Sequence, residues 1–252
     1  MNLNITVKKG TKKGTIVLLH GNSSSSKVFT PIIESDIPYS LVTFDFYGHG
    51  ESPHNNEYKL SDMKDQIMSV IKSIDEDILL AGNSLGGHLA IEVANDIKNL
   101  KGLLTFGTPP VKKPLNMEEA FILTPALNTY FTENPVQEEI DNSLATAIQN
   151  TSVMPLLKED FLKTDPKLRS VFATQVGEFS DELAILTNLT CQKFIIAGDQ
   201  DPTVNLDYLE QHKTEANYQL IKIANCGHYA SIEQPKEFLI SLEKIANQTF
   251  IE

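Results

Sequence analysis

The stretch AGNSLGGH, residues 81–88, decides the fold expected of this chain. It follows the apolar run of residues 78–80 and places one glycine two positions before Ser84 and another two positions after it. This spacing is typical of a sharp turn from a strand into a helix, in which neighbouring residues must lack side chains and the serine hydroxyl stands clear of the sheet. Alone, the pattern also fits a turn of small residues without chemistry. Apolar positions at helical spacing in residues 89–97 favour the first interpretation, with Ser84 as a nucleophile.

A serine hydroxyl becomes a good nucleophile when a base takes its proton and a third group holds that base. Among the six histidines, His228 follows the last predicted strand, behind a glycine, and completes the chain order serine, acid, histidine. We therefore predict that His228 is the base. We expect His20 and His49 to hydrogen-bond the loops that they open, and His88 to be a packed or capping residue on the helix after Ser84.

The acid that orients the histidine is expected just past the preceding strand, where AGDQDPTV, residues 197–204, offers two aspartates. Asp199 directly follows the glycine at the strand end. Asp201 lies in the loop before Pro202, a residue well suited to open the next helix. We predict Asp201 as the acid, with Asp199 as the alternative, and the mechanism is the same for either.

Acyl transfer also needs hydrogen-bond donors aimed at the developing oxyanion. In this type of strand and helix arrangement one donor is the backbone N–H of the residue after the nucleophile, here Leu85. The other comes from the loop after an early strand, HGNSSSS, where Asn22 is the natural candidate. A polar turn without a catalytic role is the alternative for that loop.

Short apolar runs alternate with helical patterns along the chain, which predicts an α/β fold with a mostly parallel central sheet and helices on both faces. A helix is expected over residues 61–74, with Ser61 as its N-cap. Residues 3–9 are expected to form a hairpin through Gly10–Gly14 onto the first of the main strands. The main strands are predicted at residues 15–20, 39–46, 77–82, 102–107, 191–198 and 218–224.

The alternation stops over residues 112–182, where helical stretches take over. We predict an inserted helical cap there, because the segment is too long for a bare loop. The core would then consist of residues 1–111 and 183–252. An apolar wall for a substrate is expected from Phe121, Leu123, Leu127, Tyr130 and Phe131, with Ile122, Leu156, Leu157 and Phe161 as further candidates. The alternative is that most of these nine side chains simply pack the cap onto the core.

The composition narrows the possible partners. With 33 acidic and 21 basic residues, the chain has a net charge of -12, which argues against nucleic acid or an anionic membrane and favours a small neutral substrate. The amino terminus lacks the apolar core of a secretory signal, so we expect a cytoplasmic location. Cys191 and Cys226 are expected to be free thiols, and no motif for a metal or a cofactor is visible. The sequence carries no signal for an oligomeric state.

In their order and spacing, LHGNSSSS, DFYGHGES, GNSLGGH, GDQDP and NCGH resemble the α/β-hydrolase superfamily over nearly the whole chain. Within it, residues 20–25, SLGGH and GTPPV at residues 107–111 resemble the α/β-hydrolase type of N-acyl-homoserine-lactone hydrolases, the quorum-quenching lactonases. The resemblance implies an α/β-hydrolase fold and a metal-independent serine hydrolase without a cofactor. Its roles match the residues above: Ser84 as nucleophile, Asp201 as acid, His228 as base, and Asn22 with Leu85 as the oxyanion hole.

The chain departs from that family's pattern at two positions, since Asn83 stands where the family carries an aromatic residue and Asp201 where it carries glutamate. Both departures leave the chemistry intact. They bear on the shape of the pocket, and Asn83 is therefore expected to contact the substrate. A carboxylesterase or another small-molecule hydrolase with the same triad is the first alternative function, because a fold and a triad do not fix the substrate. A ligand receptor built on the same fold is the second.

Overall fold

The computed structural model describes residues 2–251, in which seven strands form one sheet. The strand order is β1-β3-β2-β4-β5-β6-β7, and every pairing except that of β1 is parallel. The predicted mostly parallel α/β sheet is thus confirmed. The strands span Ile5–Lys8 (β1), Thr15–Leu19 (β2), Ser40–Phe44 (β3), Ile78–Asn83 (β4), Leu100–Phe106 (β5), Gln192–Gly198 (β6) and Gln219–Ile223 (β7).

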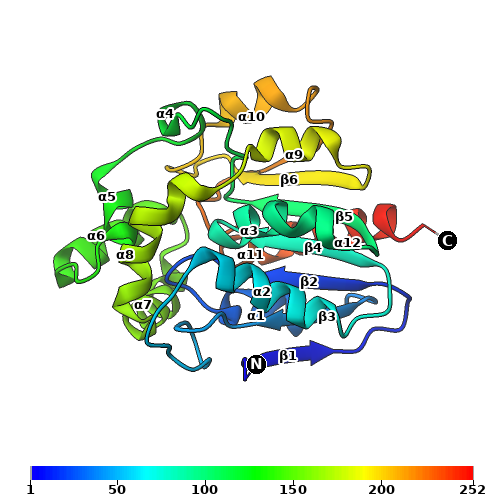
Figure 1. Ribbon diagram of the computed structural model, residues 1–252, viewed down its shortest axis with the longest axis horizontal. Coiled ribbons are helices and arrows are strands. Elements are labelled where there is room, and N and C mark those ends of the chain that lie inside the picture. Colours follow the sequence, from blue (N-terminus) through cyan, green and yellow to red (C-terminus); the bar gives the residue numbers. More distant parts are fainter. Residues whose placement is uncertain (1, 252) are drawn as a thin grey trace.

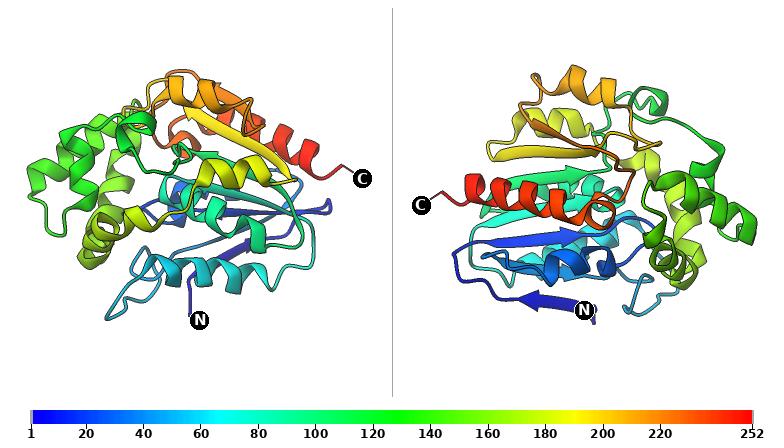
Figure 2. Two further views of the ribbon diagram at one scale, coloured as in Figure 1. Left: turned by 45° about the horizontal axis from the view of Figure 1, so that its top comes forward. Right: turned by 180° about the vertical axis from the view of Figure 1, so that it is seen from behind.

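The central strands are apolar on both faces because helices cover the sheet on both sides (Figures 1 and 2). Alternate residues of β2 divide between the two layers: Val17 and Leu19 join the core on one face, while Ile16 and Leu18 join the core on the other. The first face is covered by α2 (Leu60–Ile71), α3 (Leu85–Val93), α9 (Glu182–Asn188) and α10 (Leu206–His212). The second face is covered by α1 (Thr30–Ile33), α11 (Ala230–Glu233) and α12 (Pro235–Thr249).

The amino-terminal strand pairs differently from the prediction. β1 runs antiparallel to β3, with Ile5 opposite Phe44, and does not form a hairpin with β2. The reason is that β3 and β4 already occupy both edges of β2, so the free edge lies on β3. The loop between β1 and β2 crosses the sheet end, where Thr11 and Lys12 donate their backbone N–H groups to Pro38.

Two predicted helix starts are also wrong. α2 begins one residue before Ser61, with the extended Lys59 at the N-cap and no side-chain cap. Pro202 does not open a helix, because α10 begins at Leu206 and is capped by Asn205, whose side chain accepts two backbone N–H groups. An effective cap three residues further on therefore outweighs the proline signal.

The chain between β5 and β6 is helical and lies beyond the carboxyl ends of the parallel strands, on the left in Figure 1. This helical segment ends in α9, which packs against α3 on the sheet. Short 3-10 turns connect several of these helices, and one of them, η3 (Thr129–Phe131), lies next to the site described below. The helices are α4 (Met117–Ala120), α5 (Pro125–Asn128), α6 (Gln137–Ala147), α7 (Met154–Lys163) and α8 (Pro166–Gln175).

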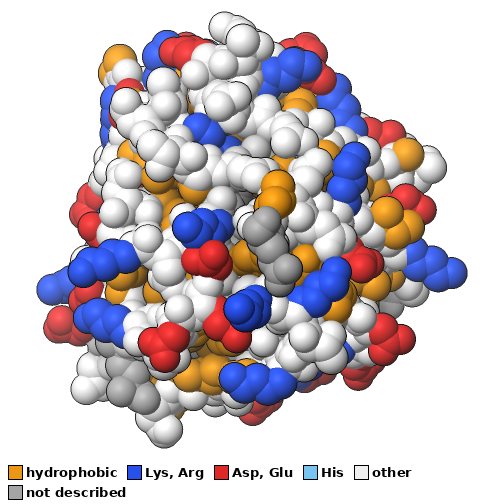
Figure 3. All heavy atoms as spheres, turned by 90° about the vertical axis from the view of Figure 1, so that its right-hand side faces the viewer, with side chains coloured by type: hydrophobic (Ala, Val, Ile, Leu, Met, Phe, Trp, Pro, Cys, Tyr) orange, Lys and Arg blue, Asp and Glu red, His pale blue; other side chains and the backbone are white. Residues whose placement is uncertain are grey.

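The opposite end of the molecule has a mixed surface. Figure 3 shows Lys and Arg side chains interspersed with Asp and Glu side chains over that face. Within residues 2–251, none of the helices has the length and apolar character needed to cross a membrane. Cys191 and Cys226 are both free, as predicted.

Candidate active site

Ser84 lies at a strained corner between β4 and α3. Its φ of 51° and ψ of -121° are rare for a residue with a side chain and mark stored backbone strain. The corner closes because Gly82 and Gly86 lack side chains: a Cβ on Gly82 would lie 2.2 Å from the carbonyl oxygen of Gly86. The backbone N–H of Ser84 donates to Phe106 at the end of β5, at 2.9 Å. The local geometry is therefore that of the predicted turn.

Asp201 and His228 form a hydrogen-bonded pair. The Nδ1 atom of His228 lies 2.9 Å from Oδ2 of the buried Asp201. The other carboxylate oxygen, Oδ1, accepts both the backbone N–H and the hydroxyl of Thr203, at 2.9 and 2.7 Å. Asp199 instead accepts the backbone N–H of Cys226 and does not reach the histidine. Of the two aspartates in this loop, the structure brings Asp201 to His228.

The interaction between Asp201 and His228 shifts the pKa of both side chains. Burial lowers the pKa of His228, but the charge and the hydrogen bond of Asp201 outweigh it and hold that pKa above its ordinary value. Burial raises the pKa of Asp201, and the interaction with His228, together with the Thr203 hydrogen bonds, reverses this effect and lowers the pKa. Asp201 is thus ionised at neutral pH and directs the protonated Nδ1 of His228 toward itself, which leaves Nε2 free to act as a base.

A second buried carboxylate, Glu233 on α11, holds the loop that carries His228. Its Oε1 accepts the backbone N–H of Tyr229 at 2.9 Å, and its Oε2 accepts that of Gly227 at 3.1 Å. The same Oε2 also accepts the backbone N–H groups of Gln149 and Asn150, which follow α6. Glu233 was missed in the sequence because no motif links it to residues more than eighty positions away.

The loop after β2 lies against the corner of Ser84. A Cβ on Gly21 would come within 3.1 Å of Cβ of Ser84, so the backbone at Gly21 and Asn22 passes close to the serine. The side chain of Asn22, a residue that lines the cavity, donates to the carbonyl of Tyr130 at 2.7 Å. Leu85 is the first residue of α3, so its N–H has no partner within the helix. The oxyanion-hole role of these two backbone N–H groups stays a prediction.

His20 and His49 are fully buried and serve the loops around them. Nε2 of His20 accepts the backbone N–H of Phe46 at 3.1 Å, and Nε2 of His49 accepts that of Ser23 at 3.3 Å. Burial lowers the pKa of both rings, so both stay neutral. As expected, they brace the two loops rather than face the cavity.

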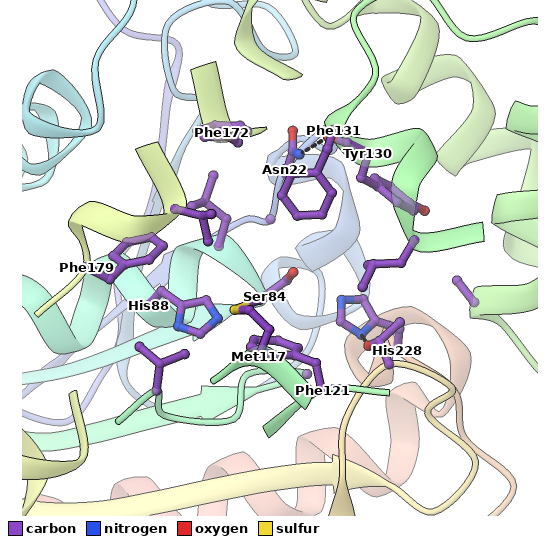
Figure 4. A pocket seen from close by; sticks show the side chains of 18 of the residues that line it. Asn22, Ser84, His88, Met117, Phe121, Tyr130, Phe131, Phe172, Phe179 and His228 are labelled. Carbon is purple, nitrogen blue, oxygen red and sulfur yellow. Dashed lines mark hydrogen bonds between the residues drawn. The ribbon is translucent and has the colours of Figure 1, made fainter. Parts of the chain in front are cut away.

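A largely apolar cavity opens at Ser84 (Figure 4). Of the five side chains predicted to form its wall, Phe121, Leu127, Tyr130 and Phe131 line it. Leu123 does not, because it is 52% exposed on the outer surface. Among the other apolar candidates, Leu157 and Phe161 are buried in the core instead. The wall is completed by residues not singled out in the sequence, including Leu60, Val111, Met117, Phe172, Val176 and Phe179.

Asn83 does not line the cavity, contrary to the expectation from its place beside Ser84. It is 1% exposed, and its side-chain amide donates to the carbonyls of Phe106 and His228, at 3.1 and 3.3 Å. Successive side chains of a strand point to opposite sides, so the last residue of β4 cannot share the direction of the serine at the turn. Asn83 thus links the end of β5 to the loop that carries His228.

His88 lines the cavity, although the sequence predicted only a packed or capping role for it. Its Nδ1 lies 2.9 Å from both oxygens of Glu182, which is completely buried. Burial raises the pKa of Glu182, and the adjacent His88 opposes that rise. Figure 4 shows the ring of His88 pointing into the cavity, and in this view Ser84 lies between His88 and His228.

Comparisons with known proteins agree with this fold. The structure superimposes on a solved structure of the N-acyl homoserine lactonase AidH complexed with N-butanoyl homoserine, with a TM-score of 0.87 and 24% identity over 98% of this chain and 93% of that chain. A thermophilic esterase from Thermogutta terrifontis gives a TM-score of 0.80 at 18% identity, over 98% of this chain and 94% of that chain. In sequence, the chain is 21% identical to the proline iminopeptidase PfmaB of Pestalotiopsis fici over 248 residues, which is 87% of this chain and 86% of that protein.

Residues 16–241 match the model of the alpha/beta hydrolase family. The match covers the strained serine, both members of the carboxylate–histidine pair and the loop after β2. The chain therefore belongs to the alpha/beta hydrolase family.

Proposed function

We propose that this protein is a serine hydrolase of small esters and lactones, and that it opens the lactone ring of N-acyl homoserine lactones. The observation that carries the proposal is the strained Ser84 in the wall of an apolar cavity that is also lined by His228, whose Nδ1 is held 2.9 Å from Asp201. A serine, a base and a buried acid at one cavity are the groups that acyl transfer requires.

In the proposed reaction, Oγ of Ser84 attacks the lactone carbonyl carbon while its proton passes to Nε2 of His228. The N–H groups of Asn22 and Leu85 stabilise the tetrahedral oxyanion. When the ring C–O bond breaks, His228 returns the proton to the departing ring oxygen, which stays attached to the acyl group as a hydroxyl. Water, activated by the same histidine, then attacks the ester carbonyl of the acyl-enzyme and releases the hydroxy acid and Ser84.

The wall of the cavity supports an apolar acyl group as part of the substrate. Phe131, Tyr130 and Leu127 come from the helical segment between β5 and β6. Ser84 and His228 come from the turn after β4 and the loop after β7. We therefore propose that residues 112–182 act as a cap that selects the acyl group, on a core made of residues 1–111 and 183–252. A mutant of the N-acyl homoserine lactonase AidH, which shares this fold, was solved in complex with N-hexanoyl homoserine lactone, and we carry that substrate class over as part of the proposal.

The proposed mechanism needs no metal ion, because the triad supplies the base and the backbone supplies the oxyanion donors. We expect a chelator such as EDTA to leave the rate unchanged. Loss of activity in EDTA that is restored by zinc would contradict a metal-free mechanism.

The test is hydrolysis of N-acyl homoserine lactones of several chain lengths, followed with a pH indicator because ring opening releases a carboxylic acid. Simple nitrophenyl esters are assayed in parallel, with Ser84→Ala as the catalytic control. We expect turnover of the lactones and a loss of more than about a thousandfold in the variant. Turnover of the simple esters alone would make the protein a carboxylesterase, a class with which the Thermogutta terrifontis structure agrees. Tight binding of a lactone without turnover would favour a receptor.

A further inference from the structure

A second histidine–carboxylate pair lies in the wall of the cavity, and the proposed reaction does not use it. Both carboxylate oxygens of Glu182 lie 2.9 Å from Nδ1 of His88. Oε2 of Glu182 also accepts the backbone N–H of Val111 at 2.8 Å. The carboxylate is completely buried and is held from two sides, so it fixes the orientation of the imidazole ring.

This arrangement defines what the ring offers to a ligand. Nδ1 of His88 must carry a hydrogen in order to donate to Glu182, so Nε2 is an acceptor whenever the ring holds only that one hydrogen. No group among residues 2–251 makes a hydrogen bond to that nitrogen. The ring packs on Phe179 and Phe121, with centroids 5.2 and 5.9 Å apart, and points into the cavity (Figure 4). Nε2 is thus a polar acceptor set in an aromatic part of the wall.

The position of His88 on α3 determines which part of a substrate it reaches. His88 lies one turn along α3 from Ser84, with its backbone N–H donating to the carbonyl of Ser84 at 3.1 Å, and both residues line the same cavity (Figure 4). A substrate whose carbonyl is attacked by Ser84 therefore brings substituents two or three bonds from that carbonyl within reach of Nε2. An amide N–H attached to the α-carbon can donate a hydrogen bond to Nε2 of His88. A methylene at the same place would exclude water from Nε2 and leave it without a donor.

We propose that His88, held by Glu182, is a specificity-determining residue that accepts a hydrogen bond from an N–H on the α-carbon of the ester or lactone substrate. The proposal rests on the proposed function in one respect, since Ser84 must attack the carbonyl. It does not require the substrate to be a lactone. It assigns the α-acylamino group, rather than the ring, as the feature that is recognised on this side of Ser84.

The test compares substrates that differ only by an N–H or a CH₂. One pair is N-hexanoyl homoserine lactone and its analogue with a methylene in place of the amide N–H. The other pair is open-chain: N-hexanoylglycine methyl ester and methyl 4-oxononanoate. For the wild-type protein we expect kcat/KM to favour the N–H member of each pair by roughly tenfold or more.

Two variants remove the acceptor in different ways. His88→Phe keeps an aromatic ring against Phe179 but has no nitrogen, and it should bring the ratio of the two rates close to one. In Glu182→Gln the amide oxygen still accepts the N–H of Val111, while its NH₂ group donates to Nδ1 and shifts the imidazole hydrogen to Nε2. This variant should also lose the preference. If it does not fold, as judged by circular dichroism, His88→Phe decides the question.

The matched control is Phe179→Leu, which alters the same wall without touching the hydrogen bond, and it should keep the ratio of the wild type. A wild-type ratio near one, or a ratio retained in His88→Phe, would overturn the proposal. Lactone turnover without an N–H preference would leave the proposed function standing and remove this inference. A His88-dependent preference between the open-chain esters, with no lactone turnover, would do the reverse.

Discussion

Asp160 on α7 allows a prediction whose size follows from the structure. The carboxyl group is completely buried, its Oδ2 accepts the hydroxyl of Ser25 at 2.7 Å, and its Oδ1 has no hydrogen-bond partner. Burial raises the pKa of Asp160 to about 6, even though the hydrogen bond from Ser25 and the charge of Lys27 oppose the rise. The ionised form is therefore less stable in the folded protein than in the unfolded chain.

The sign of the pH dependence follows from that difference. A carboxyl group with a higher pKa in the folded state stabilises the fold fully below its unfolded pKa of 3.8, and this contribution is lost as pH rises through about 6. At 1.36 kcal/mol for each pKa unit, the whole loss is about 3 kcal/mol, of which about 2 kcal/mol develops between roughly pH 4.5 and 8. Asp160→Asn cannot ionise, so the variant should gain about 2 kcal/mol relative to the wild type over that range.

The assay is urea unfolding of both proteins at each pH, with the difference in unfolding free energy as the measured quantity. Comparing the difference at two pH values removes the constant cost of an asparagine NH₂ group where Oδ1 has no partner. Glu159→Gln is the control, because Glu159 is the exposed neighbour that pairs with Lys27, and it should show no comparable rise. A difference for Asp160→Asn that stays constant from pH 4.5 to 8 would refute the reasoning.

Four further predictions test the site. Asp201→Asn should lower kcat by about 10⁴, by analogy with serine proteases, and Asp199→Asn should lower it little; steady-state kinetics that show the reverse would exchange their roles. The kcat/KM of the wild type should fall as pH falls through the pKa of His228, at a pH above the ordinary histidine value, and a midpoint below that value would contradict the effect of Asp201. In the wild type, a well-fitting apolar wall should raise kcat/KM by up to about fourfold for each methylene of the acyl chain. Phe131→Gln should reduce this increase, and an unchanged slope would place the acyl chain elsewhere. Glu233→Gln should lower the unfolding free energy by about 2 kcal/mol in urea titrations, because a charged acceptor for four backbone N–H groups is lost, and an unchanged value would show that these hydrogen bonds contribute little.

Turns that depend on a few neighbouring residues could be predicted from the sequence, whereas strand pairing and helix starts could not. The turn at Ser84 needs a glycine at position 82, where a Cβ would meet the backbone of Gly86, and at position 86, where it would meet the backbone at the end of β2, and the local spacing of the two glycines is enough to predict it. The pairing of β1 could not be read in the same way, because it depends on which edges the other strands leave free. Likewise, Ser61 has the residue type of an N-cap, but the helix starts one residue before it.

The lining of the cavity shows a second kind of limit. Phe131 and Phe161 belong to the same helical segment and have the same apolar character, yet Phe131 lines the cavity and Phe161 lies in the core. Helical periodicity tells which side chains leave the solvent but not whether they meet another side chain or an open cavity. The same holds for Asn83, whose neighbour faces the cavity while its own amide is bound to backbone carbonyls.

Three buried carboxylates extend this point from packing to function. Asp160 holds Ser25 in the loop that also carries Asn22, Glu233 holds the loop of His228, and Glu182 holds His88. Loops at the carboxyl edge of a parallel sheet have no ladder to satisfy their polar groups, so a charged acceptor from a distant segment is an effective way to fix them. Asp160 and Glu182 are far in the sequence from Ser25 and His88, and Glu233 joins the nearby loop of His228 to Gln149 and Asn150, more than eighty positions away. Each of the three is an ordinary acidic residue in its own local context. The candidate nucleophile, base and acid can therefore be proposed from motifs, whereas the three carboxylates that fix the surrounding loops and His88 become evident only where the folded segments come together.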